Sequence, residues 1–145
     1  MKVRQGFVSN SSSSSFVLVG VDITGKMSIT EAVKKLISEE ELANRLSETN
    51  GYYEKYGRNL YHNIDELIED DYCAALDHSC YSIINDEEQG APSGSTIIGI
   101  MIADFDTYSD TQETGIADLV TVLADLKKLG ITDSDIKVYC GTRLC

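Results

Sequence analysis

The sequence lacks any long apolar run. Nowhere do about eighteen apolar residues follow one another, so we expect no transmembrane helix. The N-terminal stretch also lacks the apolar core of a secretion signal. These absences favour a protein of the cytosol, or one carried in a particle.

Cysteine and histidine are scarce, with four Cys and two His in 145 residues. The cysteines stand among core-like residues at spacings that form no disulfide framework, so we expect reduced thiols. A zinc site needs four converging ligands, and only His78 and Cys80 are spaced as a chelating pair. Core or surface roles are therefore favoured over zinc, and nothing orients a Cys–His pair for thiol catalysis. The zinc candidates are His62, Cys73, His78 and Cys80.

Basic residues are few, with 12 Lys and Arg against 24 Asp and Glu and a net charge of -12. Residues 39–89 hold most of the imbalance, with three basic against fourteen acidic side chains. A chain this acidic repels phosphates, so direct binding to nucleic acid is not expected. An acidic surface suits a basic protein partner, mimics a nucleic-acid backbone, or simply keeps a protein soluble.

Apolar segments predict a sheet. With 42% hydrophobic residues, the chain is long enough to bury a core without metals or crosslinks. Residues 16–23 and 96–103 are short, nearly continuous apolar runs, typical of strands covered on both faces. The predicted strands span residues 16–23, 81–84, 96–103 and 136–140.

Capping patterns predict the helices. Ser28 with Glu31 forms a capping box before a helix over residues 29–37. A second box from Ser38 either continues that helix or restarts it, and Asn50-Gly51 is expected to end it. Within residues 52–77, apolar residues show no regular helical or strand spacing before Asn63. Asn63 can cap a further helix. The last helix is predicted from near Gln112 to Gly130.

The predicted order is strand, helix, acidic helical insert, strand, strand, helix, strand. This order fits a ferredoxin-like βαββαβ sandwich of the α+β class with an insertion at about residues 50–78. A small open α/β sheet would use the same elements. Such an architecture favours sheet-mediated pairing with a partner or with another copy.

A serine run near the start of the chain is the most unusual segment. Residues 9–16 read Ser-Asn-Ser-Ser-Ser-Ser-Ser-Phe, between Phe7-Val8 and Phe16-Val17. Apolar residues on both sides suggest docking, whereas a solvated tether remains the alternative. We therefore divide the chain into a docking or tether segment, residues 1–15, and a single α/β domain, residues 16–145.

Residues 2–17 resemble a start found on many small, mostly uncharacterised proteins of tailed bacteriophages and prophages. The proteins that share it have bodies that look unrelated. The resemblance therefore implies a common address or docking element, recognised by a virion component or a processing enzyme. It also implies a location in the host bacterial cytoplasm or in the virion.

An acidic motif follows the strongest predicted strand. Asp104 and Asp106, with Asp110 beyond, stand where open α/β sheets often place ligands, and paired carboxylates suit Mg²⁺. Over a short stretch the motif resembles the opening of haloacid-dehalogenase-type phosphotransferases. The favoured alternative is an Asx-rich turn leading into a helix. No cofactor is otherwise expected.

Tyrosines between residues 52 and 61 predict a contact surface. Tyr52, Tyr53 and Tyr56, with Lys55 and Arg58 among them, form an aromatic patch typical of binding hot spots. A half-buried lid over the sheet would use the same residues. The predicted partner-binding residues are Phe7, Ser11, Ser12, Ser13, Phe16, Tyr52, Tyr53, Tyr56, Glu69, Asp70 and Asp71.

Three functions remain open from the sequence. The first is a non-enzymatic phage or prophage protein that acts by protein–protein contact, as a virion-associated or structural accessory. The second is an acidic inhibitor of a host defence or nucleic-acid enzyme. The third is a metal-dependent, phosphate-handling enzyme that uses Asp104 and Asp106.

Overall fold

The computed structural model describes residues 13–85, 91–92, 94–105 and 114–144. The chain divides into two compact units. We call residues 25–79 the helical unit, and the rest of the chain the sheet unit. The division differs from the predicted single domain, since the helical segment begins well before the insert expected at residue 50.

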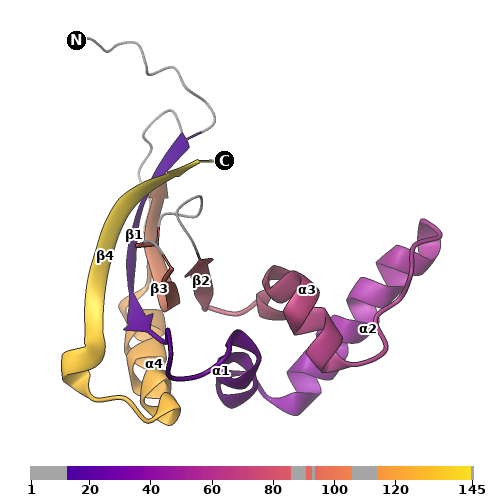
Figure 1. The fold of residues 1–145 in the computed structure, drawn as a ribbon, viewed down its shortest axis with the longest axis horizontal. Coiled ribbons are helices and arrows are strands. Elements are labelled where there is room, and N and C mark those ends of the chain that lie inside the picture. Colours follow the sequence, from indigo (N-terminus) through magenta and orange to yellow (C-terminus); the bar gives the residue numbers. More distant parts are fainter. Residues whose placement is uncertain (1–12, 86–90, 93, 106–113, 145) are drawn as a thin grey trace. The chain divides into compact units, whose positions relative to one another are not determined.

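The sheet unit holds four strands in the order β2-β3-β1-β4, and every neighbouring pair is antiparallel (Figure 1). The mixed α+β class predicted from the sequence is thereby confirmed. The strands are β1 Ser13–Asp22, β2 Ser82–Asn85, β3 Thr96–Phe105 and β4 Ile136–Leu144.

The two central strands meet at a pair of glycines. Gly20 of β1 lies opposite Gly99 of β3. A Cβ atom added at Gly99 would stand 2.0 Å from the carbonyl oxygen of Val19, and one at Gly20 would stand 2.3 Å from that of Ile98. Both positions therefore require glycine, because the strand backbones approach each other too closely for a side chain.

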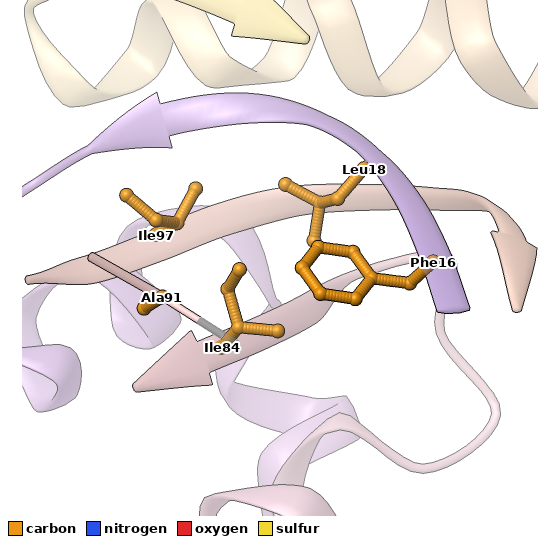
Figure 2. Close-up of a cluster of buried hydrophobic side chains, with 5 residues drawn as sticks. All are labelled: Phe16, Leu18, Ile84, Ala91 and Ile97. Atoms are coloured by element: carbon orange, nitrogen blue, oxygen red, sulfur yellow. The ribbon is translucent and has the colours of Figure 1, made fainter. Parts of the chain in front are cut away.

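Side chains from both faces of the sheet build the core. Successive residues of a strand point to opposite faces. One face carries the cluster in Figure 2, which comprises Phe16, Leu18, Ile84, Ala91 and Ile97. On the opposite face, helix α4 (Ile116–Leu126) packs on β3 and β1 and buries Val122 and Leu126.

A left-handed glycine ends the helical segment after α4. Residues Lys127–Leu129 form a 3₁₀ turn, and Gly130 follows with φ 78° and donates its N–H to the Lys127 carbonyl. This geometry confirms the stop predicted at Gly130. A second 3₁₀ turn, Asp133–Asp135, leads into β4.

Three helices build the helical unit, and each begins at a side-chain cap. Ser28 and Glu31 form the predicted capping box, with the Glu31 N–H 3.1 Å from Ser28 Oγ. Ser38 caps separately, accepting from the Glu41 N–H at 3.2 Å, so the second cap restarts a helix. The helices are α1 Ile29–Leu36, α2 Glu39–Lys55 and α3 Ile64–Leu76.

The core of the helical unit comes from the apolar faces of these helices. Helix α3 contacts both α1 and α2. The buried side chains are Ala32, Val33, Leu36, Ile37, Leu42, Leu67, Ile68, Ala75 and Leu76. Among the described residues, no helix has the length and apolar character that crossing a bilayer requires.

Two predicted boundaries differ from the structure. Asn50-Gly51 does not end α2, which continues to Lys55, because the Asn50 side chain bonds to a distant backbone instead of capping. The predicted division after residue 15 falls inside β1, which begins at Ser13. Ser15 pairs with Phe105 and with Thr142, so pairing on both sides extends the strand into the serine run.

The ferredoxin-like topology stays a prediction. In such a sandwich, helices from both crossovers cover one face of the antiparallel sheet. Helix α4 follows β3 and packs on the sheet as that topology expects. Helix α1 follows β1 but groups with α2 and α3 in the helical unit.

Candidate functional site

Four tyrosines of the helical unit form a continuous row that we call the tyrosine ridge (Tyr52, Tyr53, Tyr56 and Tyr61). The ring centroids are 4.8 Å apart for Tyr52 and Tyr56, 6.2 Å for Tyr52 and Tyr53, and 5.6 Å for Tyr53 and Tyr61. All three pairs are tilted, which is a favourable arrangement for aromatic rings. The ridge joins the last turns of α2 to the segment that follows.

Helical spacing and a glycine turn produce the ridge. Tyr52 and Tyr56 are four residues apart, so they neighbour each other on the helix surface. Gly57 then adopts φ 68°, and the Arg58 N–H donates to the Tyr53 carbonyl at 2.9 Å. This left-handed residue ends the helix and turns the chain back.

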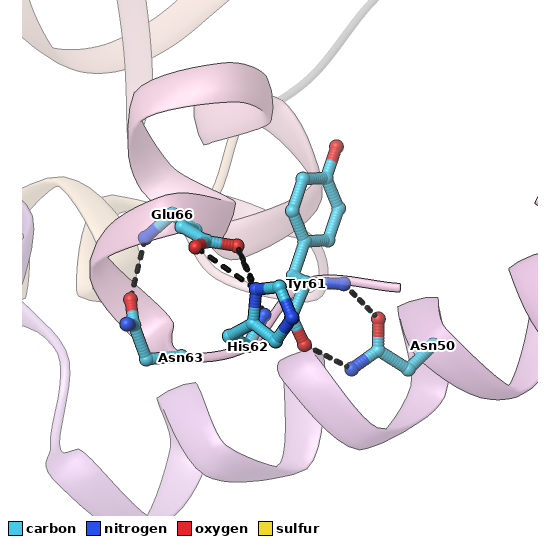
Figure 3. A network of polar contacts seen from close by, with 5 residues as sticks. All are labelled: Asn50, Tyr61, His62, Asn63 and Glu66. Atoms are coloured by element: carbon cyan, nitrogen blue, oxygen red, sulfur yellow. Dashed lines mark hydrogen bonds and ion pairs between the residues drawn. The ribbon is translucent and has the colours of Figure 1, made fainter. Parts of the chain in front are cut away.

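Asn50 fixes the returning segment in place (Figure 3). Its Nδ2 donates to the Tyr61 carbonyl at 2.9 Å, and its Oδ1 accepts from the Tyr61 N–H at 2.9 Å. Both bonds are partly buried. The Asn50 amide therefore satisfies both backbone groups of Tyr61, as a neighbouring strand would. The sequence did not predict this role, because the pair Asn-Gly is typical of the end of a helix and is interpreted in that way.

Reciprocal caps fix the start of α3 beside the ridge. Asn63 Oδ1 accepts from the Glu66 N–H at 2.8 Å, and Glu66 Oε1 accepts from the His62 N–H at 2.9 Å (Figure 3). The His62 ring lies 3.2 Å from the same carboxylate. The hydrogen bond from the His62 backbone N–H is the main cause that holds the pKa of Glu66 below its usual value, and the contact with the His62 ring is the second.

Tyr61 connects the ridge to the acidic face of α3. Its hydroxyl donates to the Asp70 carboxylate. This hydrogen bond, and then burial, raise the pKa of Tyr61 well above its usual value. The phenol therefore stays protonated and holds Asp70 at the end of the row.

Residues of the ridge line two hollows. The larger, the tyrosine groove, has a volume of about 620 Å³ and is lined by Tyr53, Arg58, Asn59, Leu60, Tyr61, Glu66, Glu69 and Asp70. The smaller has a volume of about 230 Å³ and is lined by Arg45, Glu48, Thr49, Tyr52, Tyr53, Asp71, Ala74 and Asp77. Tyr53 lines both hollows.

Cations near the ridge already contact ring faces. The Arg58 guanidinium carbon lies 5.1 Å from the Tyr53 centroid, and Lys55 Nζ lies 5.9 Å from that of Tyr56. Both distances are within the usual range of cation–π contacts. The helical unit has six Lys and Arg against twelve Asp and Glu, so acidic side chains are in excess in the unit as a whole.

The structure brings most of the predicted partner-binding residues of this segment together. Tyr52 and Tyr56 are 58% and 60% exposed, as a contact surface requires. Glu69 and Asp70 line the tyrosine groove. Asp71 lies on the other side, at a kink in α3 with φ -148° and ψ 75°, where its Oδ1 accepts from the Ala74 N–H.

The serine segment lies mostly outside the described residues, which include neither Phe7 nor Ser11 nor Ser12. Ser13 begins β1. Phe16 is only 3% exposed and packs in the cluster of Figure 2. Its side chain therefore serves the core of the sheet unit, which accounts for one of the two apolar flanks of the serine run.

The predicted metal ligands are only partly described. Asp104 lies near the end of β3, whereas Asp106 and Asp110 are outside the described residues. Within the described ranges, no group of three or more His, Cys, Asp and Glu side chains could hold a metal ion. Of the zinc candidates, His62 contacts Glu66, His78 lies 3.4 Å from Asp77, and neither Cys73 nor Cys80 is in a disulfide.

The chain was compared with protein-family models, with curated proteins and with solved structures. None of the three comparisons finds a match.

Proposed function

We propose that this chain is a non-enzymatic binding protein that contacts a protein partner through the tyrosine ridge. The observation that carries the proposal is the preformed row of rings, with Tyr52 and Tyr56 more than half exposed. Tyrosine is enriched at binding hot spots because a large amphipathic ring loses little entropy on binding. Asn50 fixes the backbone beneath the row, which lowers the ordering cost further.

The chemistry of the groove favours a basic segment as the partner. Glu66, Glu69 and Asp70 line the groove together with Tyr53. A Lys or Arg side chain of the partner would find both carboxylates and an aromatic ring in the same groove. Two cations of the helical unit already contact ring faces in this way, which supports the same use by a partner.

The N-terminal resemblance supports a phage or prophage setting for this contact. Residues 2–17 resemble a start found on many small proteins of tailed phages and prophages. The partner would then be a virion component or a host protein. We propose a virion-associated or structural accessory role, in the host bacterial cytoplasm or in the virion.

Affinity capture from infected or prophage-induced cells tests the proposal. The bait is the full chain, compared with the double variant Tyr52→Ala/Tyr56→Ala and with Glu40→Gln. Glu40 is an exposed residue of the first turn of the same helix, so it serves as a matched control. We expect the partner to be retained by the wild type and by Glu40→Gln, and lost from the double variant. Equal recovery by all three would refute the role of the ridge.

A second candidate function is an acidic inhibitor of a host defence or nucleic-acid enzyme. The three basic and fourteen acidic residues between positions 39 and 89 favour it. A complex based on charge mimicry alone weakens steeply with salt, whereas a ridge complex loses only the part of its affinity that comes from the carboxylates and keeps the part that comes from the rings of Tyr52 and Tyr56. Raising the salt from about 0.1 to about 1 M, where the screening length falls from about 10 to about 3 Å, therefore separates the two functions.

A further inference from the structure

We propose that two copies of this chain pair through their β4 strands, antiparallel and centred on Tyr139, to form one continuous sheet. The inference concerns the sheet unit and goes beyond the proposed function of the helical unit. Three observations support it: an open strand edge, an uncovered apolar surface beside it, and charges of opposite sign at the two ends of the strand.

The open edge belongs to β4. This strand pairs with β1 along its whole length, from Ser13 opposite Leu144 to Val21 opposite Ile136. Because β4 ends the strand order, no described strand pairs with its other side. The opposite edge of the sheet, β2, has only 4 residues against 9 in β4. Long edge strands are usually protected against pairing with another chain by proline or by several charged residues. Strand β4 has no proline, and Lys137 is the only charged residue in its middle.

An apolar surface continues from this edge onto α4. Ile136 and Val138 share one face of β4, and Val138 is 62% exposed. Val120 of α4 is 58% exposed. Between helix and strand lies a hollow of about 500 Å³, lined by Val120, Leu123, Ala124, Lys127, Asp133 and Ile136. Helix α4 covers β3 and β1, so the β4 part of the same face is left for another molecule.

The charge pattern of β4 is complementary to itself. Asp135 immediately precedes the strand, and Arg143 stands near its other end. Antiparallel pairing centred on Tyr139 sets the Asp135 position opposite the Arg143 position of the second copy, and the reverse. Lys137 then stands opposite Gly141. Moving the centre to Cys140 would instead set Lys137 opposite Arg143, which is repulsive.

This self-complementarity favours a second copy as the occupant. In a two-fold arrangement each contact occurs twice, so the two opposite-charge pairs and both apolar surfaces contribute. An unrelated strand would satisfy the backbone of β4 but would match its charges only if it carried the complementary charges itself. Edge-to-edge pairing adds main-chain hydrogen bonds, and the side chains define the register.

Disulfide crosslinking tests the register. The variant Val138→Cys is made with Cys73, Cys80 and Cys145 changed to Ser, which leaves Cys140 as its partner. Pairing centred on Tyr139 sets position 138 directly opposite position 140 of the second copy, within disulfide range. We expect copper-phenanthroline oxidation to give a dimer, with mass spectrometry identifying the 138–140 link. Thr142→Cys in the same background is the control, because position 142 faces Ile136.

The mass of the uncrosslinked wild type in solution decides the proposal. We expect sedimentation equilibrium to give twice the 15.9 kDa chain mass. Val138→Lys should raise the dissociation constant at least about tenfold with an unchanged circular dichroism spectrum, since this side chain is exposed in one copy. A wild type that stays monomeric at every concentration would overturn the proposal, as would equal crosslinking of Thr142→Cys. Tyr52→Ala/Tyr56→Ala should still dimerise, so failure of the ridge and failure of the dimer are distinguishable.

Discussion

The sheet unit and the helical unit have the same numbers of charged residues but are held together by different contacts. Each has six Lys and Arg and twelve Asp and Glu. Backbone pairing and close contact between glycines organise the sheet unit, whereas caps and side-chain clamps organise the helical unit. Net charge therefore does not identify the binding surface. The binding surface that we propose rests instead on the arrangement of aromatic and carboxylate groups around a fixed backbone.

The largest effect is expected where the central strands meet. Gly99→Val would place a branched side chain against the Val19 carbonyl, so we expect the sheet unit to lose more than about 4 kcal/mol or not to fold. Urea unfolding followed by circular dichroism measures the loss. Gly51→Ala is the contrasting change, because Gly51 is an exposed helical residue with open space around it, and it should stabilise by about 0.5–1 kcal/mol.

Core truncation compares the two units directly. Leu126→Ala in the sheet unit and Leu67→Ala in the helical unit each remove a fully buried side chain, and each should cost about 2–5 kcal/mol. Hydrogen exchange followed by mass spectrometry reports which amides lose protection. We expect each substitution to affect mainly its own unit. Equal loss of protection in both units would show that they unfold together and would contradict the division.

Removing the Asn50 clamp should have an intermediate effect. Asn50→Ala leaves the N–H and carbonyl of Tyr61 without their partner, at a cost of about 1–3 kcal/mol in the helical unit. Asn50→Asp keeps the acceptor for the Tyr61 N–H but sets a carboxylate oxygen against the Tyr61 carbonyl, so it should also be less stable than the wild type. Thermal unfolding measures both losses, and an Ala variant as stable as the wild type would argue against the clamp.

The smallest effect concerns the Tyr61 hydroxyl and depends on pH. Its pKa is raised in the folded state, so its stabilising contribution is complete below the ordinary tyrosine pKa of 10.0 and is lost as the pH rises above that value. Tyr61→Phe should cost about 1 kcal/mol at neutral pH. Above pH 10 the difference between wild type and variant should shrink, as urea unfolding at several pH values would show. A constant difference would contradict the hydrogen bond to Asp70.

Local signals account for what the sequence predicted well. The caps at Ser28, Ser38 and Asn63 act within three residues, so the starts of α1, α2 and α3 follow from nearby residues alone. The apolar strands and the stop at Gly130 are equally local. Three of the four ridge tyrosines were predicted to form a contact surface, because helical spacing brings Tyr52 and Tyr56 together.

Long-range contacts account for the rest. Helix α2 passes through Asn50-Gly51 because Asn50 bonds to Tyr61, a contact that no local pattern indicates. Strand β1 begins at Ser13 because β4 supplies pairing partners from Ser13 onward and β3 from Ser15 onward, whatever the local preference of serine. The tyrosine groove depends on the hydrogen bond from the Tyr61 hydroxyl to the Asp70 carboxylate, nine residues further along the chain. Contacts of this kind are set by the packing of α2 against α3.

The affinity for the recovered partner tests the central claim most directly. Calorimetric titration should compare the wild type with Tyr52→Ala/Tyr56→Ala in the helical unit and with Val138→Lys in the sheet unit. We expect the double tyrosine variant to bind at least about tenfold more weakly, a loss typical of truncated hot-spot residues, and Val138→Lys to bind as the wild type does. Unchanged affinity in the double variant, with binding lost in Val138→Lys, would place the contact surface on the sheet unit and contradict the account.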